Sequence, residues 1–181
     1  MNRALAMTSA LVAVAALPAM GAHAQGFYVD GGYTFIGIDV EDAGTSFDAD
    51  IGAITGHAGF DINEFLAVEG EVGVGVDDEE VSAAGIDAEL GLNYLVGAYG
   101  KAQYPVSETI SLYARAGVVN AELEAEVSGA GSDSASDTGF GFGVGADAYL
   151  SDRGGIRVDY TRYDIEDLEA DAFSVGYKFR F

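Results

Sequence analysis

Apolar and polar residues alternate along almost the whole chain beyond residue 25, and this period of two restricts the fold more than any other feature. In residues 87–104, every even position from Ala88 to Tyr104 is apolar or glycine. The odd positions of the same stretch include Asp87, Glu89, Asn93, Lys101 and Gln103. Successive side chains point to opposite faces in a β-strand, whereas a helical face repeats about every 3.6 residues. The pattern therefore predicts strands with one apolar and one polar face.

Eight segments show this alternation and are predicted to be the strands of one domain. They cover residues 27–39, 51–61, 65–76, 87–104, 110–119, 138–150, 156–163 and 173–181. The connections at 61–64, 105–109 and 151–155 are short, and those at 39–50, 77–86, 122–137 and 164–171 are longer. Short turns at one end and longer loops at the other are typical of outer-membrane barrels. Because an open sheet would leave unpaired edges, we expect an all-β, eight-stranded antiparallel up-and-down transmembrane β-barrel.

The two faces of the strands indicate which side meets lipid. The polar face is crowded with glycine, most clearly at Gly139, Gly141, Gly143 and Gly145, and small residues suit the narrow interior of an eight-stranded barrel. The apolar face carries bulky residues such as Phe140 and no charge in the strand interiors, where a charge facing lipid would cost about 2–4 kcal/mol. A soluble, lipocalin-like barrel would reverse this arrangement. We therefore expect the apolar face to point outward into lipid.

Composition excludes several other classes of protein. The net charge is −22, yet 49% of residues are apolar, a fraction too high for a disordered acidic chain. The absence of cysteine excludes disulfides and thiolate metal sites. With 8 Lys and Arg residues against 30 Asp and Glu, nucleic acid is not an expected partner.

Residues 1–24 are predicted to be a cleaved signal peptide. Arg3 precedes a run over residues 4–17 that is apolar except for Thr8 and Ser9, and Ala22-His23-Ala24 has the small-residue pattern of a cleavage site. The alternative, a membrane anchor helix, fits less well because the run is shorter than the ~20 apolar residues of a span. We expect export through the inner membrane and a mature barrel domain over residues 25–181.

Three stretches resemble the small outer-membrane β-barrel family of OmpA and OmpX type. Residues 59–69, GFDINEFLAVE, are similar to the family's first short-turn hairpin, and residues 104–117 are similar to its central hairpin. Residues 173–181, FSVGYKFRF, resemble the family's C-terminal signal, in which Tyr177, Phe179 and Phe181 would be read by the outer-membrane assembly machinery. The resemblance implies a barrel in the outer membrane of a Gram-negative cell. No peptidoglycan-binding domain follows, so anchoring to the wall by that route is not expected.

Three features could carry chemistry, and each has a simpler structural interpretation. His57, the only histidine after the predicted cleavage site, could be a catalytic base, but no signature serine adjoins it, so hydrogen bonding in the lumen is favoured. Residues 139–145 have glycine at every second position, unlike a phosphate-binding loop. The acidic stretches 77–80 and 166–169 lack the order of a calcium loop and are interpreted as solvated tips, with divalent-cation bridging to lipopolysaccharide as an alternative.

Charges on the inward face are predicted to form a network. The first four predicted strands contribute Asp30, Glu69, Glu71 and Glu89, and the last four contribute Arg115, Arg157, Lys178 and Arg180, with Asp147 and Asp159 among them and Lys101 as an exception on the first side. His57 and Asp159 are included in the predicted network. Unpaired buried charges are costly, so this distribution predicts ion pairs across a plugged lumen. The alternative is loose pairing in water-filled ends.

These observations predict an integral outer-membrane barrel with a structural or surface-interaction role, such as envelope integrity or adhesion, without enzymatic activity or cofactor. The expected partners are outer-membrane lipid, lipopolysaccharide and the assembly machinery, and the expected state is a monomer. The alternatives are a narrow pore for small solutes or ions and a lipid-A-modifying enzyme.

Overall fold

The computed structural model of the chain describes residues 26–42, 45–77, 79–83, 86–127, 131–165 and 168–181. Its strands are β1 Phe27–Asp42, β2 Thr45–Asp61, β3 Leu66–Asp77, β4 Glu79–Ala83, β5 Ile86–Pro105, β6 Ile110–Val127, β7 Gly131–Tyr149, β8 Gly154–Ile165 and β9 Leu168–Arg180. No helix among these residues is long and apolar enough to cross a membrane. The predicted signal peptide, residues 1–24, lies outside the described residues.

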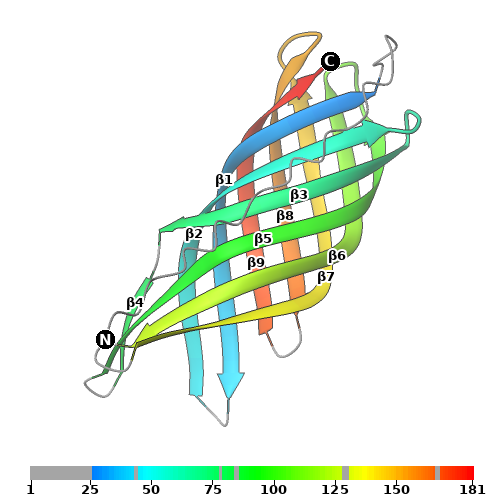
Figure 1. Cartoon of the computed structure of the whole chain (residues 1–181). Helices are drawn as coiled ribbons and strands as arrows, with labels where there is room; N and C mark the ends of the chain where they lie inside the picture. Colours follow the sequence, from blue (N-terminus) through cyan, green and yellow to red (C-terminus); the bar gives the residue numbers. More distant parts are fainter. Residues whose placement is uncertain (1–25, 43–44, 78, 84–85, 128–130, 166–167) are drawn as a thin grey trace, which may run out of the picture.

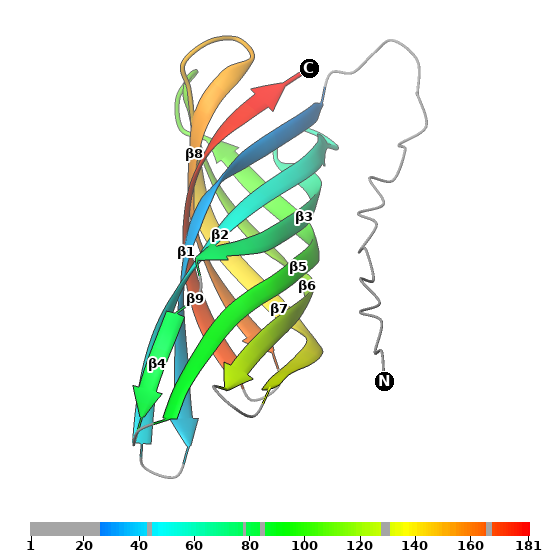
Figure 2. The ribbon, with the colours of Figure 1, turned by 60° about the vertical axis from the view of Figure 1, so that its left-hand side comes forward.

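The strands form one closed antiparallel barrel with eight sides (Figure 1, and Figure 2 from a second direction). The order around the ring is β3-β2-β1-β9-β8-β7-β6-β5, and pairing of β3 with β5 closes it. The short strand β4 is not a ninth side, because it pairs farther along the same strand β5, with Glu79 opposite Leu90. The predicted eight-stranded antiparallel up-and-down barrel is confirmed.

Tight turns join the strands at one end of the barrel, as the sequence predicts. The backbone N–H groups of Ile62, Val106 and Leu150 donate to the carbonyls of the residues that begin the next strands, at 2.8–2.9 Å. Both ends of the described chain lie at this same end, where the Phe181 N–H donates to the Phe27 carbonyl at 3.1 Å. Because short turns of an outer-membrane barrel are expected to face the periplasm, this end is called the periplasmic end.

At the opposite end, the strands are longer than predicted. The register of β1 with β2 continues to Asp42 opposite Thr45, and that of β6 with β7 to Val127 opposite Gly131. The prediction of long loops over 39–50 and 122–137 was therefore wrong for most of their residues. Alternation of apolar side chains disappears where neither face of a hairpin needs lipid or core contacts, but backbone pairing does not depend on it.

A register shift in β5 reverses the predicted faces of a few residues. The shift lies between Leu92 and Tyr94 in the pairing of β5 with β6. Leu92 is 7% exposed, inside the barrel, while Asn93 is exposed, opposite to the uninterrupted alternation expected over 87–104. A bulge adds one residue to one strand and so moves the following side chains to the other face.

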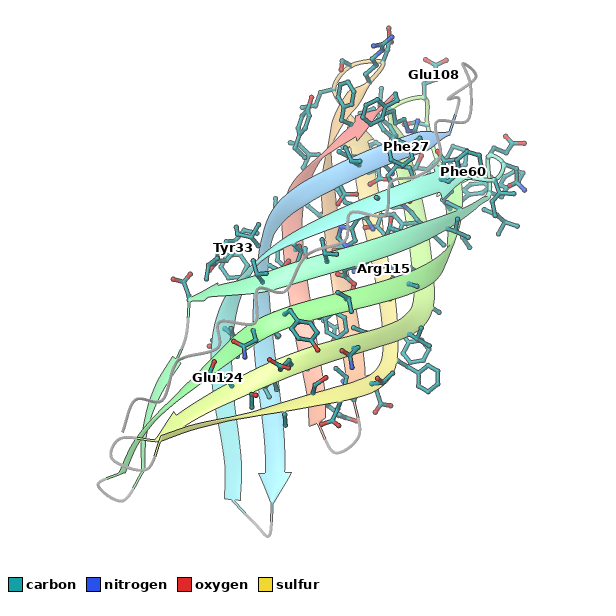
Figure 3. The ribbon with its side chains drawn as sticks, in the orientation of Figure 1. Phe27, Tyr33, Phe60, Glu108, Arg115 and Glu124 are labelled. Atoms are coloured by element: carbon teal, nitrogen blue, oxygen red, sulfur yellow. The ribbon has the colours of Figure 1, made fainter. Side chains whose placement is uncertain are left out.

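The outward face of the barrel is apolar, as predicted. Val72, Val144 and Phe142 are each about half exposed, at 49%, 57% and 52%. Figure 3 shows Phe60 and Tyr33 on the outside of the wall and Arg115 inside it. In water these exposed side chains would be unfavourable, whereas in a bilayer they meet hydrocarbon.

Glycines on the inward face leave room for large inward side chains from neighbouring strands. A Cβ on Gly145 would lie 2.5 Å from the ring of Tyr113, and a Cβ on Gly143 would lie 2.6 Å from Thr161 Oγ1 and 3.0 Å from Arg115 Nε. The interpretation of residues 139–145 as small inward residues beside bulkier neighbours agrees with these distances.

The lumen changes character along its axis. Toward the long hairpins, inward side chains form an apolar cluster, here called the outer apolar layer: Ile36, Ile38, Ile51, Ala53, Leu92, Leu95, Val119, Ala121, Tyr163, Ile165, Ala170 and Ala172. The small cavity inside this layer is lined by apolar residues and Tyr163. The polar face of the strands predicts a polar lumen, so this apolar layer differs from the prediction.

Candidate functional site

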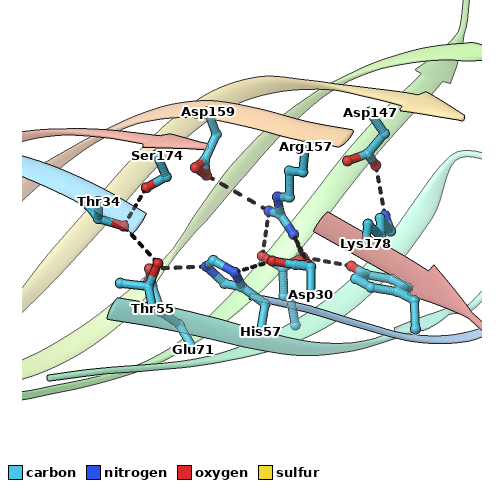
Figure 4. A network of polar contacts seen from close by, with 12 residues as sticks. Asp30, Thr34, Thr55, His57, Glu71, Asp147, Arg157, Asp159, Ser174 and Lys178 are labelled. Carbon is cyan, nitrogen blue, oxygen red and sulfur yellow. Dashed lines mark hydrogen bonds and ion pairs between the residues drawn. The ribbon is translucent and has the colours of Figure 1, made fainter. Parts of the chain in front are cut away.

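The candidate site is a set of buried charged side chains in the middle of the lumen, here called the lumen charge layer: Asp30, His57, Glu69, Glu71, Lys101, Arg115, Asp147, Arg157, Asp159 and Lys178. The side chains of all ten residues are at most 3% exposed. They come from all eight sides of the barrel, because alternation turns one residue in two of each strand inward. Figure 4 shows part of this layer from close by.

Arg157 on β8 and Glu69 on β3 are paired across the full width of the barrel. These strands are four positions apart in the ring, so they face each other. The two guanidinium NH₂ nitrogens of Arg157 donate to the two Glu69 oxygens at 2.7 and 2.9 Å. Arg157 also donates to Asp30 Oδ2 at 2.7 Å and to the Tyr113 hydroxyl at 2.6 Å. Such bidentate, charge-assisted pairs are the strongest that side chains form, and they restrict geometry.

Arg115 on β6 extends the same arrangement toward the outer apolar layer. Its guanidinium lies 3.1 Å from Glu69 Oε1, 3.3 Å from Glu71 Oε1 and 3.2 Å from Asp159 Oδ2. It also donates to Thr161 Oγ1 at 2.8 Å. Three carboxylates around one guanidinium compensate for its removal from water.

His57 on β2 lies between two carboxylates on the neighbouring strands. Its Nδ1 lies 2.6 Å from Asp30 Oδ1, and its Nε2 lies 3.1 Å from Glu71 Oε1. These contacts follow from the register, which sets His57 opposite Asp30 on one side and opposite Glu71 on the other. Both ring nitrogens are therefore engaged, and the ring acts as a hydrogen-bonding bridge in the layer.

Two lysines share one carboxylate on the periplasmic side of the layer. Lys178 Nζ lies 2.7 Å from Asp147 Oδ2, and Lys101 Nζ lies 3.4 Å from the same oxygen. Each ammonium also lies over a tyrosine ring, Lys178 at 3.7 Å from the centroid of Tyr28 and Lys101 at 3.8 Å from that of Tyr113. Aromatic faces stabilise buried cations by cation–π attraction. Lys101, an exception in the sequence pattern, is thus held like the other cations.

Of the predicted network, Arg180 lies outside this layer among the described contacts, and the side chain of Glu89 falls outside what the structure describes. Arg180 lies at the periplasmic end, with its guanidinium 3.9 Å from the centroid of the Tyr149 ring and no ion pair within the part of the chain that the structure describes. Glu89 belongs to β5, beyond the register shift, and its side chain lies outside the described part of the chain. The acidic residues 78, 166 and 167 also lie outside the described residues.

Alternation places Tyr28, Tyr113 and Tyr163 on the inward face, but the predicted network leaves them out. Tyr28 donates to Glu69 Oε2 at 2.7 Å, and Tyr163 donates to Glu71 Oε1 at 3.0 Å. In the paired strands, large inward tyrosines lie opposite glycines: Tyr28 lies opposite Gly59, and Tyr113 lies opposite Gly145. This pairing is the sequence feature that could have identified the tyrosines as members of the layer. Reading it requires the register between strands, which alternation within one strand does not provide.

The C-terminal residues lie on the barrel wall at its periplasmic rim. Tyr177 and Phe181 are 55% and 56% exposed on the outward face. The Phe181 ring packs on Phe179 and Phe27, with centroids 5.2 and 5.3 Å apart. An aromatic group at this height suits the interface between hydrocarbon and water.

Within the described residues, no three or more His, Asp and Glu side chains form a group arranged to hold a metal ion. What the lumen charge layer can do chemically is bind its own members together. Its nitrogens and carboxylates are directed at one another rather than at a common substrate position.

Comparison with known proteins gives information on the family of this chain. The family model described as outer membrane protein beta-barrel domain matches residues 7–181. No curated protein sequence matches this chain.

Several solved structures share the fold. Ail, the attachment invasion locus protein of Yersinia pestis, is 17% identical with a TM-score of 0.64, covering 86% of this chain and 99% of that chain. Neisserial surface protein A is 16% identical with a TM-score of 0.67, covering 88% and 100%. The N-terminal β-barrel domain of OprF from Pseudomonas aeruginosa is 15% identical with a TM-score of 0.56, covering 85% and 97%. The family model spans nearly the whole chain, and the protein therefore belongs to the outer membrane protein β-barrel domain family and resides in the outer membrane.

Proposed function

We propose that this protein is a monomeric, non-enzymatic outer-membrane barrel with a structural or surface-interaction role, and that its lumen is closed. The observation that carries the proposal is the Arg157–Glu69 pair, which crosses the barrel between opposite sides and is surrounded by further ion pairs. Side chains held in this way occupy the path that a solute would follow.

Two successive barriers support a closed lumen. Passage through the lumen charge layer requires several charge-assisted pairs to open together, which would leave buried charges without partners, and such charges are costly. The outer apolar layer lies next along the axis, and apolar constrictions exclude water and ions by dewetting. A solute would have to pass both.

The long hairpins support a role at the cell surface. Residues 39–50, 77–89, 122–137 and 164–171 contain no Lys or Arg, so the outer end of the barrel is uniformly acidic in sequence. Ail has been solved in complex with the heparin analogue sucrose octasulfate. An acidic surface repels such a polyanion, so we expect cationic partners here, or contact with lipopolysaccharide phosphates through divalent cations.

Export and assembly are part of the same proposal. Residues 1–24 would direct the chain across the inner membrane, and Tyr177, Phe179 and Phe181 would be read by the outer-membrane assembly machinery. Support comes from the exposed aromatic group of these residues at the end of β9, which an assembly factor could reach from the periplasm.

The alternative function is a narrow pore for small solutes or ions. The observation in its favour is a cavity of about 670 Å³ that opens at the periplasmic end of the lumen. This cavity would be the entrance of such a pore.

Planar-bilayer recording distinguishes the two functions. We expect the purified, refolded protein to give no discrete channels, and we expect the same of Arg157→Ala, because the outer apolar layer remains intact. Combining Arg157→Ala with Leu95→Ser breaches both layers and should produce channels, whereas Arg153→Ala, in a periplasmic turn, serves as the matched control. Discrete channels from the unmodified protein would establish the pore and overturn the proposal.

A further inference from the structure

The cavity at the periplasmic end of the lumen, here called the periplasmic mouth, has the features of a ligand site. Its volume of about 670 Å³ is within the range of ~300–1,000 Å³ typical of small-molecule sites. All three short turns and both ends of the described chain line it, including Asp61, Gln103, Tyr149, Asp152 and Arg180. Short, hydrogen-bonded turns hold this rim in place.

Polar atoms in the periplasmic mouth lack partners within the described part of the molecule. They are Arg180 Nε, Gln103 Oε1 and the Tyr149 hydroxyl, all buried. Gln103 is 9% exposed, and its amide nitrogen donates to Asp61 Oδ1 at 2.9 Å, which fixes its orientation and leaves its oxygen unpartnered. Buried polar groups without partners are costly, so such a group in a cavity points to something that binds there.

The unpartnered atoms define the chemistry of that ligand. Arg180 supplies a donor and a positive charge, which call for a carboxylate, and its face packs on Tyr149 at 3.9 Å. Gln103 supplies an acceptor, which calls for an N–H group or an ammonium. The Tyr149 hydroxyl can donate or accept.

The charges around the mouth narrow the choice further. Its lining carries the carboxylates of Asp61, Glu64, Glu108 and Asp152 against the guanidiniums of Arg153 and Arg180. A simple anion would be repelled by this excess of negative charge, while a ligand with both a carboxylate and ammonium groups is attracted. We infer that the periplasmic mouth binds a short peptide that carries a free carboxylate, held by Arg180, and ammonium groups, held by Gln103 and the acidic rim.

This site lies on the periplasmic side of the lumen charge layer and does not require the lumen to conduct. Arg180, which lies outside that layer, would have its role here rather than in the predicted charge network. The protein would then contact a periplasmic ligand at one end and the extracellular space at the other.

Titration of the refolded barrel in detergent micelles with lysyl-alanine tests the inference. We expect saturable NMR shifts at Ser111, which lines the mouth, with half-saturation in the millimolar range. Lysyl-alanine amide lacks the carboxylate, and N-acetyl-alanine lacks the ammonium groups. Each should bind at least about tenfold more weakly than lysyl-alanine, as expected for loss of a charge-assisted contact.

Variants locate the site. Arg180→Gln should weaken binding of lysyl-alanine about tenfold, and Thr109→Ala, an exposed position that does not line the mouth, should not change it. If Arg180→Gln fails to fold, as judged by a gel shift between boiled and unboiled samples, then Gln103→Leu gives the same test. The inference is overturned by unsaturable shifts, by equal binding of the amide, or by binding that survives both variants.

Discussion

Replacement of Arg157 by methionine tests the lumen charge layer at its centre. Methionine keeps the apolar stem of the side chain, to about the position of Nε, but removes the guanidinium. The change removes two hydrogen bonds to Glu69 at 2.7 and 2.9 Å, one to Asp30 at 2.7 Å and one to Tyr113 at 2.6 Å. It leaves a buried excess of negative charge.

These contacts set the expected loss in the free energy of unfolding. Each hydrogen bond to a charged group contributes about 1.5–3 kcal/mol. The sum for the three carboxylate contacts would exceed the cost usually seen when one partner of a buried ion pair is removed. Glu69 keeps Arg115 at 3.1 Å, and Asp30 keeps His57 at 2.6 Å, so the loss is partly compensated. We expect Arg157→Met to lower the free energy of unfolding by about 3–5 kcal/mol.

Urea unfolding of the barrel in lipid vesicles, followed by circular dichroism and by the gel shift between boiled and unboiled samples, measures this change. Arg153→Met is the matched control, because Arg153 is exposed in a turn and should change stability by less than ~0.5 kcal/mol. Adding Glu69→Gln to Arg157→Met should cost less than the sum of the single changes. A loss below about 1 kcal/mol for Arg157→Met, or additive single changes, would refute the cross-barrel network.

Three further predictions concern the wall. Gly143→Ala should destabilise the barrel by about 1–3 kcal/mol, because its Cβ would lie 2.6 Å from Thr161 Oγ1, whereas Gly100→Ala, with its nearest atom at 4.0 Å, should be neutral in the same unfolding assay. Val72→Arg places a charge on the lipid face and should cost about 2–4 kcal/mol in vesicles; an unchanged unfolding midpoint would argue against a lipid-facing position. Deletion of Phe181 should reduce the folded protein in the outer membrane of cells, measured by fractionation, while refolding in detergent continues; equal losses in both would indicate a purely structural role.

Sequence alternation predicts the strands and their faces because the β pleat has a period of two and lipid requires apolar side chains. The alternation does not predict strands that lie outside the membrane or positions where a bulge interrupts the period. Beyond the membrane the hairpins continue as paired backbone without an apolar face, so β1 extends to Asp42. At the shift between Leu92 and Tyr94 the period itself is interrupted, and no residue in the sequence marks the place.

Inward charges are predictable for the same reason, but their partners are not. Asp30 lies opposite Lys178 in the register of β1 with β9, yet Lys178 pairs with Asp147 on β7, and Asp30 pairs with His57 and Arg157. Partners two to four strands away depend on the tilt and stagger of the closed barrel, which only the three-dimensional fold defines. His57 is the exception, since both of its partners are direct cross-strand neighbours.

Labelling of single cysteines in intact cells tests most directly that this chain is an outer-membrane barrel with its long hairpins outside. The chain has no cysteine, so each introduced thiol is unique. Ser136→Cys lies exposed on the outer part of β7, and Ser107→Cys lies exposed in a periplasmic turn. A membrane-impermeant maleimide should label Ser136→Cys on intact cells and Ser107→Cys only after the outer membrane is permeabilised. Labelling of Ser107→Cys on intact cells, or of neither variant until the inner membrane is opened, would contradict this placement.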